Sequence, residues 1–197
     1  MRYFKKIVGE LVYLSPVNLE DLEKYTTWVN DIFIASRLGS ASKNFSREKE
    51  KEFLEDLVKD GHNFAIVKKD SDKLMGNVSL FDINQIHRTA LMGVFIGDEE
   101  NRGKGMGKES IKLILEYGFK ILNLNNVMLN VFSFNEKAIE AYKSVGFKEI
   151  GKRREAHFIN GQYFDEIYMD ILEKDFKSNY LNSLLPKRKW FKVIYLN

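Results

Sequence analysis

Apolar positions recur along the chain with two different spacings. In some segments they alternate with polar positions, as on a strand with one buried face, and in others they recur every three or four residues, as on an amphipathic helix. Strands are predicted at Ile7–Leu14, Phe64–Val67, Leu74–Phe81, Ala90–Ile96, Asn126–Phe132, Phe147–Phe158 and Tyr163–Leu172. Helices are predicted at Leu19–Val29, Ser46–Val58, Lys104–Leu122 and Asn135–Ser144, with a short helix or loop over residues 30–40. This order predicts a single α/β domain (an α+β mixed sheet) flanked by helices.

Two local signals sharpen these boundaries. Ser46 is placed to accept a hydrogen bond from the first turn of its helix, as an N-cap residue does. Asn160-Gly161 separates the last two strands and is typical of a type I′ hairpin turn. The helix between Ala90–Ile96 and Asn126–Phe132 predicts a right-handed crossover between parallel strands.

A glycine-rich turn follows the apolar run that ends at residue 96. Gly103, Gly105 and Gly107 alternate with other residues, Arg102 precedes them, and a helical pattern begins at once. Glycines let successive backbone N–H groups point at one ligand, and a helix start adds unpaired N–H donors and a positive dipole end. This turn therefore predicts an anion site, most plausibly for a pyrophosphate. The P-loop and dinucleotide-binding spacings are both absent.

A second motif follows the strand that ends at Phe132. Asn135 suits an N-cap and Gly146 suits the position just after a helix. Ala138, Tyr142 and Val145 recur on one face of the helix between them. This helix is therefore predicted to pack on the sheet through the face that carries Tyr142.

The two motifs together resemble the GNAT superfamily of N-acetyltransferases. Residues 102–107 match the coenzyme loop pattern Arg/Gln-x-x-Gly-x-Gly/Ala, and residues 135–147 match Asn-x-x-Ala-x-x-x-Tyr-x-x-x-Gly-Phe at every fixed position. Further segments, such as Ile83–Ala90 and Phe158–Tyr163, resemble the branch that contains ribosomal-protein N-terminal and spermidine acetyltransferases. The resemblance spans about residues 8–175. It implies an acetyltransferase domain over residues 1–175, built on a twisted mixed sheet with splayed central strands, and leaves residues 176–197 as a basic and aromatic extension.

The resemblance also implies a reaction and its machinery. Acetyl-coenzyme A is the cosubstrate, and an amine attacks its thioester directly in a ternary complex. Backbone groups of Val94, Phe95 and Ile96 hold the pantetheine arm and polarise the thioester carbonyl. Tyr142 is the general acid for the departing thiolate, because a phenol with a pKa near 10 is protonated at neutral pH. The other predicted coenzyme contacts are Arg102, Gly103, Lys104, Gly105, Met106, Gly107, Asn130, Asn135 and Lys137.

The acceptor is expected to be a small-molecule primary amine or a peptide N-terminus. Polyamine enzymes of this type carry glutamates where this chain has Ser79 and Leu91, and an acidic loop where residues 37–44 hold two bases and no carboxylate. Spermidine or another polyamine is the alternative acceptor. Asp82, Glu155 and His157 are the candidate acceptor-binding residues.

The amino-acid composition excludes several kinds of site and partner. The absence of cysteine excludes disulfides and a thiolate nucleophile, and three scattered histidines predict no metal site. A net charge of +3 is too small to imply nucleic acid. We expect a cytoplasmic protein with no membrane association, because no apolar run suits a membrane span or a signal peptide.

Two alternatives come from other function classes. The domain could bind a coenzyme without catalysing a reaction. A disrupted glycine loop or another residue in place of Tyr142 would favour this alternative, and the sequence has neither. The tail could bind nucleic acid or a membrane surface, because residues 186–192 mix bases with aromatics. We favour a tail that packs Trp190 and Phe191 on the domain or on the partner subunit of a homodimer, because the basic run is short.

Overall fold

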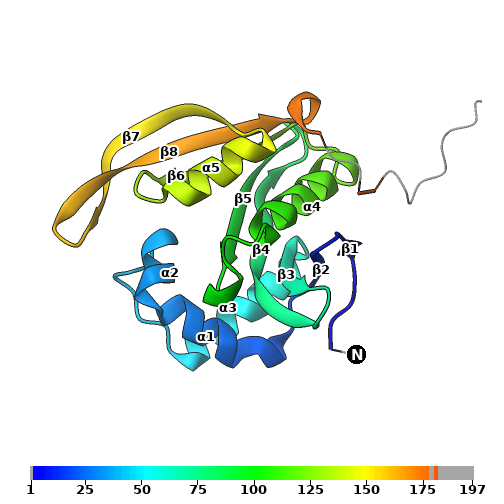
Figure 1. Cartoon of the computed structure of the whole chain (residues 1–197), viewed down its shortest axis with the longest axis horizontal. Helices are drawn as coiled ribbons and strands as arrows, with labels where there is room; N and C mark the ends of the chain where they lie inside the picture. Colours follow the sequence, from blue (N-terminus) through cyan, green and yellow to red (C-terminus); the bar gives the residue numbers. More distant parts are fainter. Residues whose placement is uncertain (1, 178–179, 182–197) are drawn as a thin grey trace, which may run out of the picture.

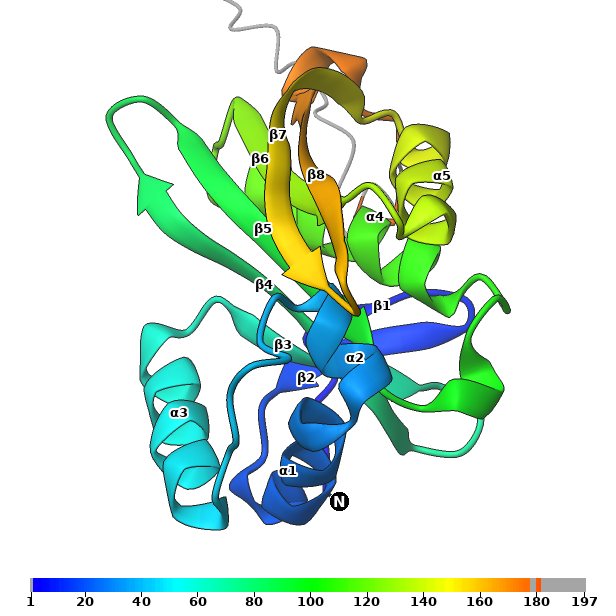
Figure 2. The ribbon, with the colours of Figure 1, turned by 90° about the vertical axis from the view of Figure 1, so that its left-hand side faces the viewer.

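The structure is a computed structural model that describes residues 2–177 and 180–181. One eight-stranded sheet has the order β1-β2-β3-β4-β5-β6-β8-β7, with helices on both faces (Figures 1 and 2). Its strands are β1 (Ile7–Val8), β2 (Val12–Pro16), β3 (Asn63–Lys68), β4 (Lys73–Asn84), β5 (Thr89–Ile96), β6 (Asn126–Phe132), β7 (Lys148–Ile159) and β8 (Gln162–Leu172). The helices are α1 (Leu22–Asn30), α2 (Ile32–Arg37), α3 (Arg47–Asp60), α4 (Met106–Lys120) and α5 (Glu136–Val145), with short 3₁₀ turns η1 (Leu19–Asp21), η2 (Glu99–Asn101) and η3 (Glu173–Asp175). The predicted mixed sheet flanked by helices is confirmed.

Strands β5 and β6 are parallel neighbours over only part of their length. Thr89, Ala90 and Leu91 pair with residues 126–128, and every other neighbouring pair in the sheet is antiparallel. β5 continues to Ile96 and β6 to Phe132, so the two strands separate beyond the paired residues. In Figure 1 the β6–β8–β7 part of the sheet runs away from the β1–β5 part. We call this separation the splay, and it confirms the predicted splayed central strands.

Two apolar layers cover the two faces of the sheet. Along β3, Phe64 and Ile66 join the cluster that contains α4 and α5, whereas Ala65 and Val67 join the cluster that contains α1 and α3. A strand buried on both faces is apolar at consecutive positions, which explains the unbroken run in β3. The face assignments therefore follow directly from strand alternation.

The predicted strand Ile7–Leu14 is wrong in one respect, because a turn divides it into β1 and β2. The Glu109 carboxylate, on α4, accepts hydrogen bonds from the backbone N–H groups of residues 10, 11 and 12 at 2.7, 2.8 and 2.9 Å. A Cβ on Gly9 would lie 2.6 Å from the Cδ atom of Glu109, so this close approach requires glycine. The turn thus depends on a residue about one hundred positions away, and strand periodicity does not report it.

Most other predicted boundaries are close to the observed ones. The Ser46 side chain accepts a hydrogen bond from the backbone N–H of Lys49 at 3.2 Å, which confirms the predicted N-cap. Asn160 and Gly161 have φ values of 49° and 75°, as a type I′ turn requires. The predicted helix at Leu19 begins instead with a 3₁₀ turn.

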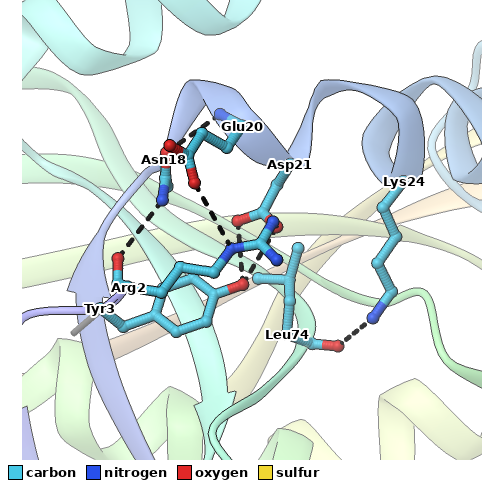
Figure 3. Close-up of polar contacts among 7 residues, drawn as sticks. All are labelled: Arg2, Tyr3, Asn18, Glu20, Asp21, Lys24 and Leu74. Atoms are coloured by element: carbon cyan, nitrogen blue, oxygen red, sulfur yellow. Dashed lines mark hydrogen bonds and ion pairs between the residues drawn. The ribbon is translucent and has the colours of Figure 1, made fainter.

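A polar cluster near the N-terminus fixes the start of α1 (Figure 3). Asp21 is only 3% exposed, and it accepts hydrogen bonds from Tyr3 Oη at 3.0 Å and from the guanidinium of Arg2. One turn later, the Lys24 ammonium donates to the Leu74 carbonyl at the start of β4. These contacts hold α1 on its face of the sheet, near the start of β4 and the end of β5.

A buried carboxylate oxygen lies under α1 and α3: within the described residues, Glu50 Oε2 has no hydrogen-bond partner. Glu50 is 1% exposed, and burial raises the pKa of its carboxyl to about 7. A buried carboxyl without a charged partner costs stability once it ionises.

This burial predicts a specific dependence of stability on pH. Between pH 4.5 and about 7 the unfolded chain has released the Glu50 proton and the folded chain still holds it, so the free energy of unfolding falls as pH rises. Glu50→Gln removes this titration, and we expect it to be about 2 to 3 kcal/mol more stable than wild type at pH 8 and nearly equal at pH 5. Urea unfolding at both pH values measures the difference. Glu52→Gln, an exposed position on the same helix, is the control; equal pH slopes in all three proteins would refute the interpretation.

Candidate functional site

A loop at the open end of the splay leads from β5 into α4. Gly103 and Gly105 have φ values of +75° and +84°, in the left-handed region that favours glycine. Helix α4 starts at Met106, two residues later than predicted. Its N-cap residue is Gly105, which makes no side-chain capping hydrogen bond. The first-turn N–H groups of this 15-residue helix are thus left without a side-chain cap. Together with the helix dipole, they suit an anionic group such as a pyrophosphate.

The side chain of Arg102 makes hydrogen bonds to the turn between β5 and this loop. Its Nε donates to the Ile96 carbonyl at 3.3 Å and its Nη2 donates to the Gly97 carbonyl at 3.0 Å. Gly97 in turn lies against the Trp28 indole. A Cβ added at this position would come 2.1 Å from that ring, so the contact leaves no room for a side chain. Arg102 therefore holds the turn at the end of β5 and adds positive charge beside the loop.

Residues 94–96 of β5 border the splay. They pair on one side with β4, Val94 with Val78 and Ile96 with Gly76, while their other edge lies beyond the last residue pair with β6. Phe95 lies on the opposite face from its neighbours and packs edge-on against Trp28 at a centroid distance of 5.9 Å. The β5 edge toward β6 therefore presents backbone groups that a ligand in the splay could use.

Helix α2 brings a second arginine to the same region. The Arg37 guanidinium lies 3.5 Å from the centroid of the Phe33 ring, and that of Arg102 lies 4.5 Å from the same ring. Arg37 also lies 5.7 Å from the ring of Phe134, which immediately precedes α5. Arg37 thus connects the end of β5 with the segment that follows β6.

Aromatic rings line the β6 side of this region. His157, on β7, stacks on Phe132 at a centroid distance of 3.9 Å and an interplanar angle of 19°. Phe134 lies next to both rings and meets Phe164 edge-on at 5.0 Å. His157 Nε2 is buried and has no hydrogen-bond partner in the part of the chain that the structure describes.

Strand β7 is irregular at Glu155 and His157, so these two side chains do not follow the alternation of a regular strand. Its register with β8 shifts between Arg153 and His157, and Glu155 has a φ of +49°. The Glu155 N–H donates to Asp165 Oδ1 at 2.9 Å, and the Asp165 N–H donates to Ser133 Oγ at 3.1 Å. A surface hollow is lined by Arg154, Glu155 and Asp165. The bulge brings Glu155 and His157 toward the end of β6, through Asp165 and through the ring of Phe132.

Helix α5 places the second motif. Asn135 is its N-cap residue, as predicted, but its side chain makes no capping hydrogen bond, which leaves that amide available to a ligand. Tyr142 is 8% exposed and packs edge-on against Phe147, and burial raises the pKa of its hydroxyl to about 12. Tyr142 therefore keeps its proton at neutral pH, as a general acid must.

The remaining predicted site residues are not all gathered at the loop. Lys104 and Lys137 are exposed, and Met106 is buried under the first turn of α4. Asn130 donates through Nδ2 to Glu166 Oε1 at 2.6 Å, so β8 already supplies its partner. Asp82 lies in a bulge of β4 near Thr89, at the opposite end of β5 from the loop, so the structure does not bring it to the loop.

Sequence reasoning missed Arg37, Phe33 and Phe134. Phe33 and Arg37 are four residues apart and therefore share one face of α2, a signal that is readable in the sequence. The contact of Arg37 with Phe134 is a tertiary contact between residues about one hundred positions apart. In the described residues, no three His, Asp or Glu side chains gather as a metal site would require. Nor does any described helix have the length and apolar character of a membrane span.

Comparison with known proteins finds a family model and relatives that match more than half of the chain. A family model described as "Acetyltransferase (GNAT) domain" matches residues 14–168. The chain is 40% identical to the spermidine N(1)-acetyltransferase of Vibrio cholerae over 126 residues, which are 64% of this chain and 70% of the relative. It is also 40% identical to that of Escherichia coli K12 over 111 residues, which are 56% of this chain and 59% of the relative.

A solved structure has the same fold. The spermidine N-acetyltransferase from Vibrio cholerae, in complex with CoA and spermine, superimposes with a TM-score of 0.76 at 32% identity. The match covers 88% of this chain and 100% of that one.

Proposed function

Because the chain belongs to the GNAT family and is an acetyltransferase, we propose that it transfers the acetyl group of acetyl-coenzyme A to a primary amine by direct attack in a ternary complex. The observation that carries the proposal is the splay of β5 and β6, which opens beside a glycine loop and the uncapped start of α4. Both substrates can then meet in one site without a covalent enzyme intermediate, and the chain has no cysteine to form a thioester of its own.

The residues at the loop fit the coenzyme. The backbone amides of residues 102–107 would bind its pyrophosphate, because the two left-handed glycines and the helix start favour an anion there. The free side-chain amide of Asn135 and the exposed Lys137 would contact the arm and the phosphates from the α5 side. Acetyl-coenzyme A supplies the activated acetyl thioester.

The chain's own groups supply polarisation and a proton. Backbone N–H groups of β5 beyond Leu91 would stabilise the negative charge that develops on the carbonyl oxygen during attack. Tyr142 holds its proton through the neutral range and would donate it to the leaving sulfur. The amine must arrive as, or become, the neutral nucleophile, since free alkylammonium groups have a pKa near 10.4.

A small-molecule amine or a peptide N-terminus is the acceptor that the local residues favour. The region between α1 and α3 is basic at Arg37 and Lys43, and Ser79 and Leu91 offer no carboxylate. A polycation would find little counter-charge there. Spermidine is the second candidate acceptor, favoured by the 40% identity to spermidine N(1)-acetyltransferases.

An acceptor screen tests the proposal and separates the two candidates. Purified protein is incubated with acetyl-coenzyme A and single amines, and both free thiol and acetylated product are measured. We expect at least one small amine or peptide N-terminus to give product with a kcat/KM of about 10⁴ M⁻¹s⁻¹ or more. Spermidine should fall below that value, and a higher value for spermidine would establish the second candidate instead. Thiol release without acetylated product would contradict amine transfer altogether.

A further inference from the structure

A stack of two guanidinium groups on one aromatic ring marks the region beside the splay. Arg37 and Arg102 both lie over Phe33, at 3.5 and 4.5 Å from its centroid. Neither arginine has an ion pair with a carboxylate within the described residues, although ten ion pairs form elsewhere among them. Two neighbouring positive charges without a counter-charge repel one another, and they favour a bound anion.

The two arginines differ in how many of their guanidinium nitrogens donate hydrogen bonds to the protein. Arg102 directs Nε and Nη2 to the carbonyls of Ile96 and Gly97. Arg37 uses only Nη1, which donates to the Phe33 carbonyl at 2.9 Å and to Ser36 Oγ at 3.4 Å. Its Nε and Nη2 make no hydrogen bond with any described residue. Arg37 is thus held in place by one edge and keeps donors for a ligand.

The surroundings of Arg37 strengthen its preference for an anion. Partial burial lowers its pKa, and the adjacent Arg102 lowers it further, so its positive charge lacks full solvation. A carboxylate or phosphate would restore that solvation with charge-assisted, bidentate hydrogen bonds. The aromatic rings of Phe33 and Phe134 lie against the guanidinium, with centroids 3.5 and 5.7 Å from its carbon, and limit its movement.

The position of Arg37 assigns this charge to the acceptor side. In the proposed site the coenzyme's pyrophosphate already has the amides at the start of α4, and Arg102 of that loop contacts the same Phe33 ring as Arg37. Arg37 instead reaches across toward Phe134, which lies beside His157 and its unpartnered buried Nε2. An anion on Arg37 would therefore belong to a molecule that approaches between α2 and the end of β6.

We propose that the acceptor of this acetyltransferase is a small primary amine that also carries a carboxylate or phosphate, and that Arg37 binds this anionic group. This inference deepens the proposed function and rests on amine transfer. It makes Arg37 a specificity-determining residue, since it selects among amines without touching the reacting atoms.

Matched acceptor pairs test the inference. O-phosphoethanolamine is compared with ethanolamine, and β-alanine with propylamine, using wild type and Arg37→Gln. We expect wild type to use one or both anionic amines with a kcat/KM at least about tenfold above the neutral partner, and Arg37→Gln to abolish that advantage. Glutamine keeps an N–H that can donate to the Phe33 carbonyl, which preserves the end of α2. Lys59→Gln, which removes an exposed positive charge from α3, should retain the advantage.

A binding experiment distinguishes this inference from the proposed function. Calorimetry of the coenzyme A-loaded protein with the same amines should show anionic amines binding to wild type and at least about tenfold more weakly to Arg37→Gln. Coenzyme A affinity should stay within about twofold. Acetylation that favours neutral amines or spermidine would overturn the inference and leave amine transfer intact. Loss of coenzyme A affinity in Arg37→Gln, with amine selectivity unchanged, would assign Arg37 to the coenzyme and overturn it as well. If no amine is acetylated, amine transfer fails, and calorimetry still decides the role of Arg37.

Discussion

Gly107→Asp is expected to weaken coenzyme A binding by about 100-fold or more while the protein remains folded, because like charges brought together cost several kcal/mol. Gly107 is in the first turn of α4, directly after the two left-handed glycines of the loop. A carboxylate there faces the place proposed for the pyrophosphate and cancels the favourable end of the helix dipole. Isothermal titration calorimetry with coenzyme A measures the loss.

Gly107 is a better position for this test than Gly105. A Cβ on Gly107 would lie 3.5 Å from Ile96 Cγ1, an ordinary contact, whereas Gly105 has a φ of +84° that strains any other residue. Gly107→Ala is the matched control: it adds the Cβ without the charge and should fold at least as well as wild type, because alanine favours helix. Unchanged coenzyme affinity in a folded Gly107→Asp protein would disprove the loop assignment.

Tyr142→Phe is expected to lower kcat about 100-fold with little change in coenzyme affinity, at the low end of the range typical of general acid catalysis. The phenylalanine keeps the ring and its edge-on contact with Phe147, and removes only the proton donor. We expect the low end because a thiolate is already a fair leaving group at neutral pH. The measurement requires a slow acceptor, so that chemistry limits turnover.

Tyr117→Phe is the control for removing a buried tyrosine hydroxyl. Tyr117 lies on α4, where its hydroxyl is 3.1 Å from Nδ1 of His62. Its loss should cost about 1 kcal/mol of stability, the usual worth of such a hydrogen bond, and leave kcat unchanged. Wild-type kcat in Tyr142→Phe under these conditions would make Tyr142 a packing residue, with the proton reaching the sulfur through water.

Local sequence determined much of this protein. The unbroken apolar run at residues 64–67 predicts a strand buried on both faces, and the alternation along residues 126–132 predicts a strand because successive side chains on a strand face opposite sides. Asn160-Gly161 determines the last hairpin, since both residues tolerate the left-handed backbone that its turn needs. The glycine loop and the Asn135–Phe147 motif are likewise local patterns, because one turn or one helix start is formed by a few consecutive residues.

Only the tertiary structure decided how distant segments complete the site. The division between β1 and β2 depends on Glu109, and the bulge at Glu155 depends on pairing with β8. The stack of Arg37 and Arg102 on Phe33, facing Phe134, unites α2, the loop after β5 and the start of α5. Periodicity reports which face of an element is buried, but not which distant side chains it meets. The glycine pattern of the loop is therefore readable from the chain alone, whereas the grouping of Arg37, Arg102 and the aromatic rings beside it emerges only when the segments pack together.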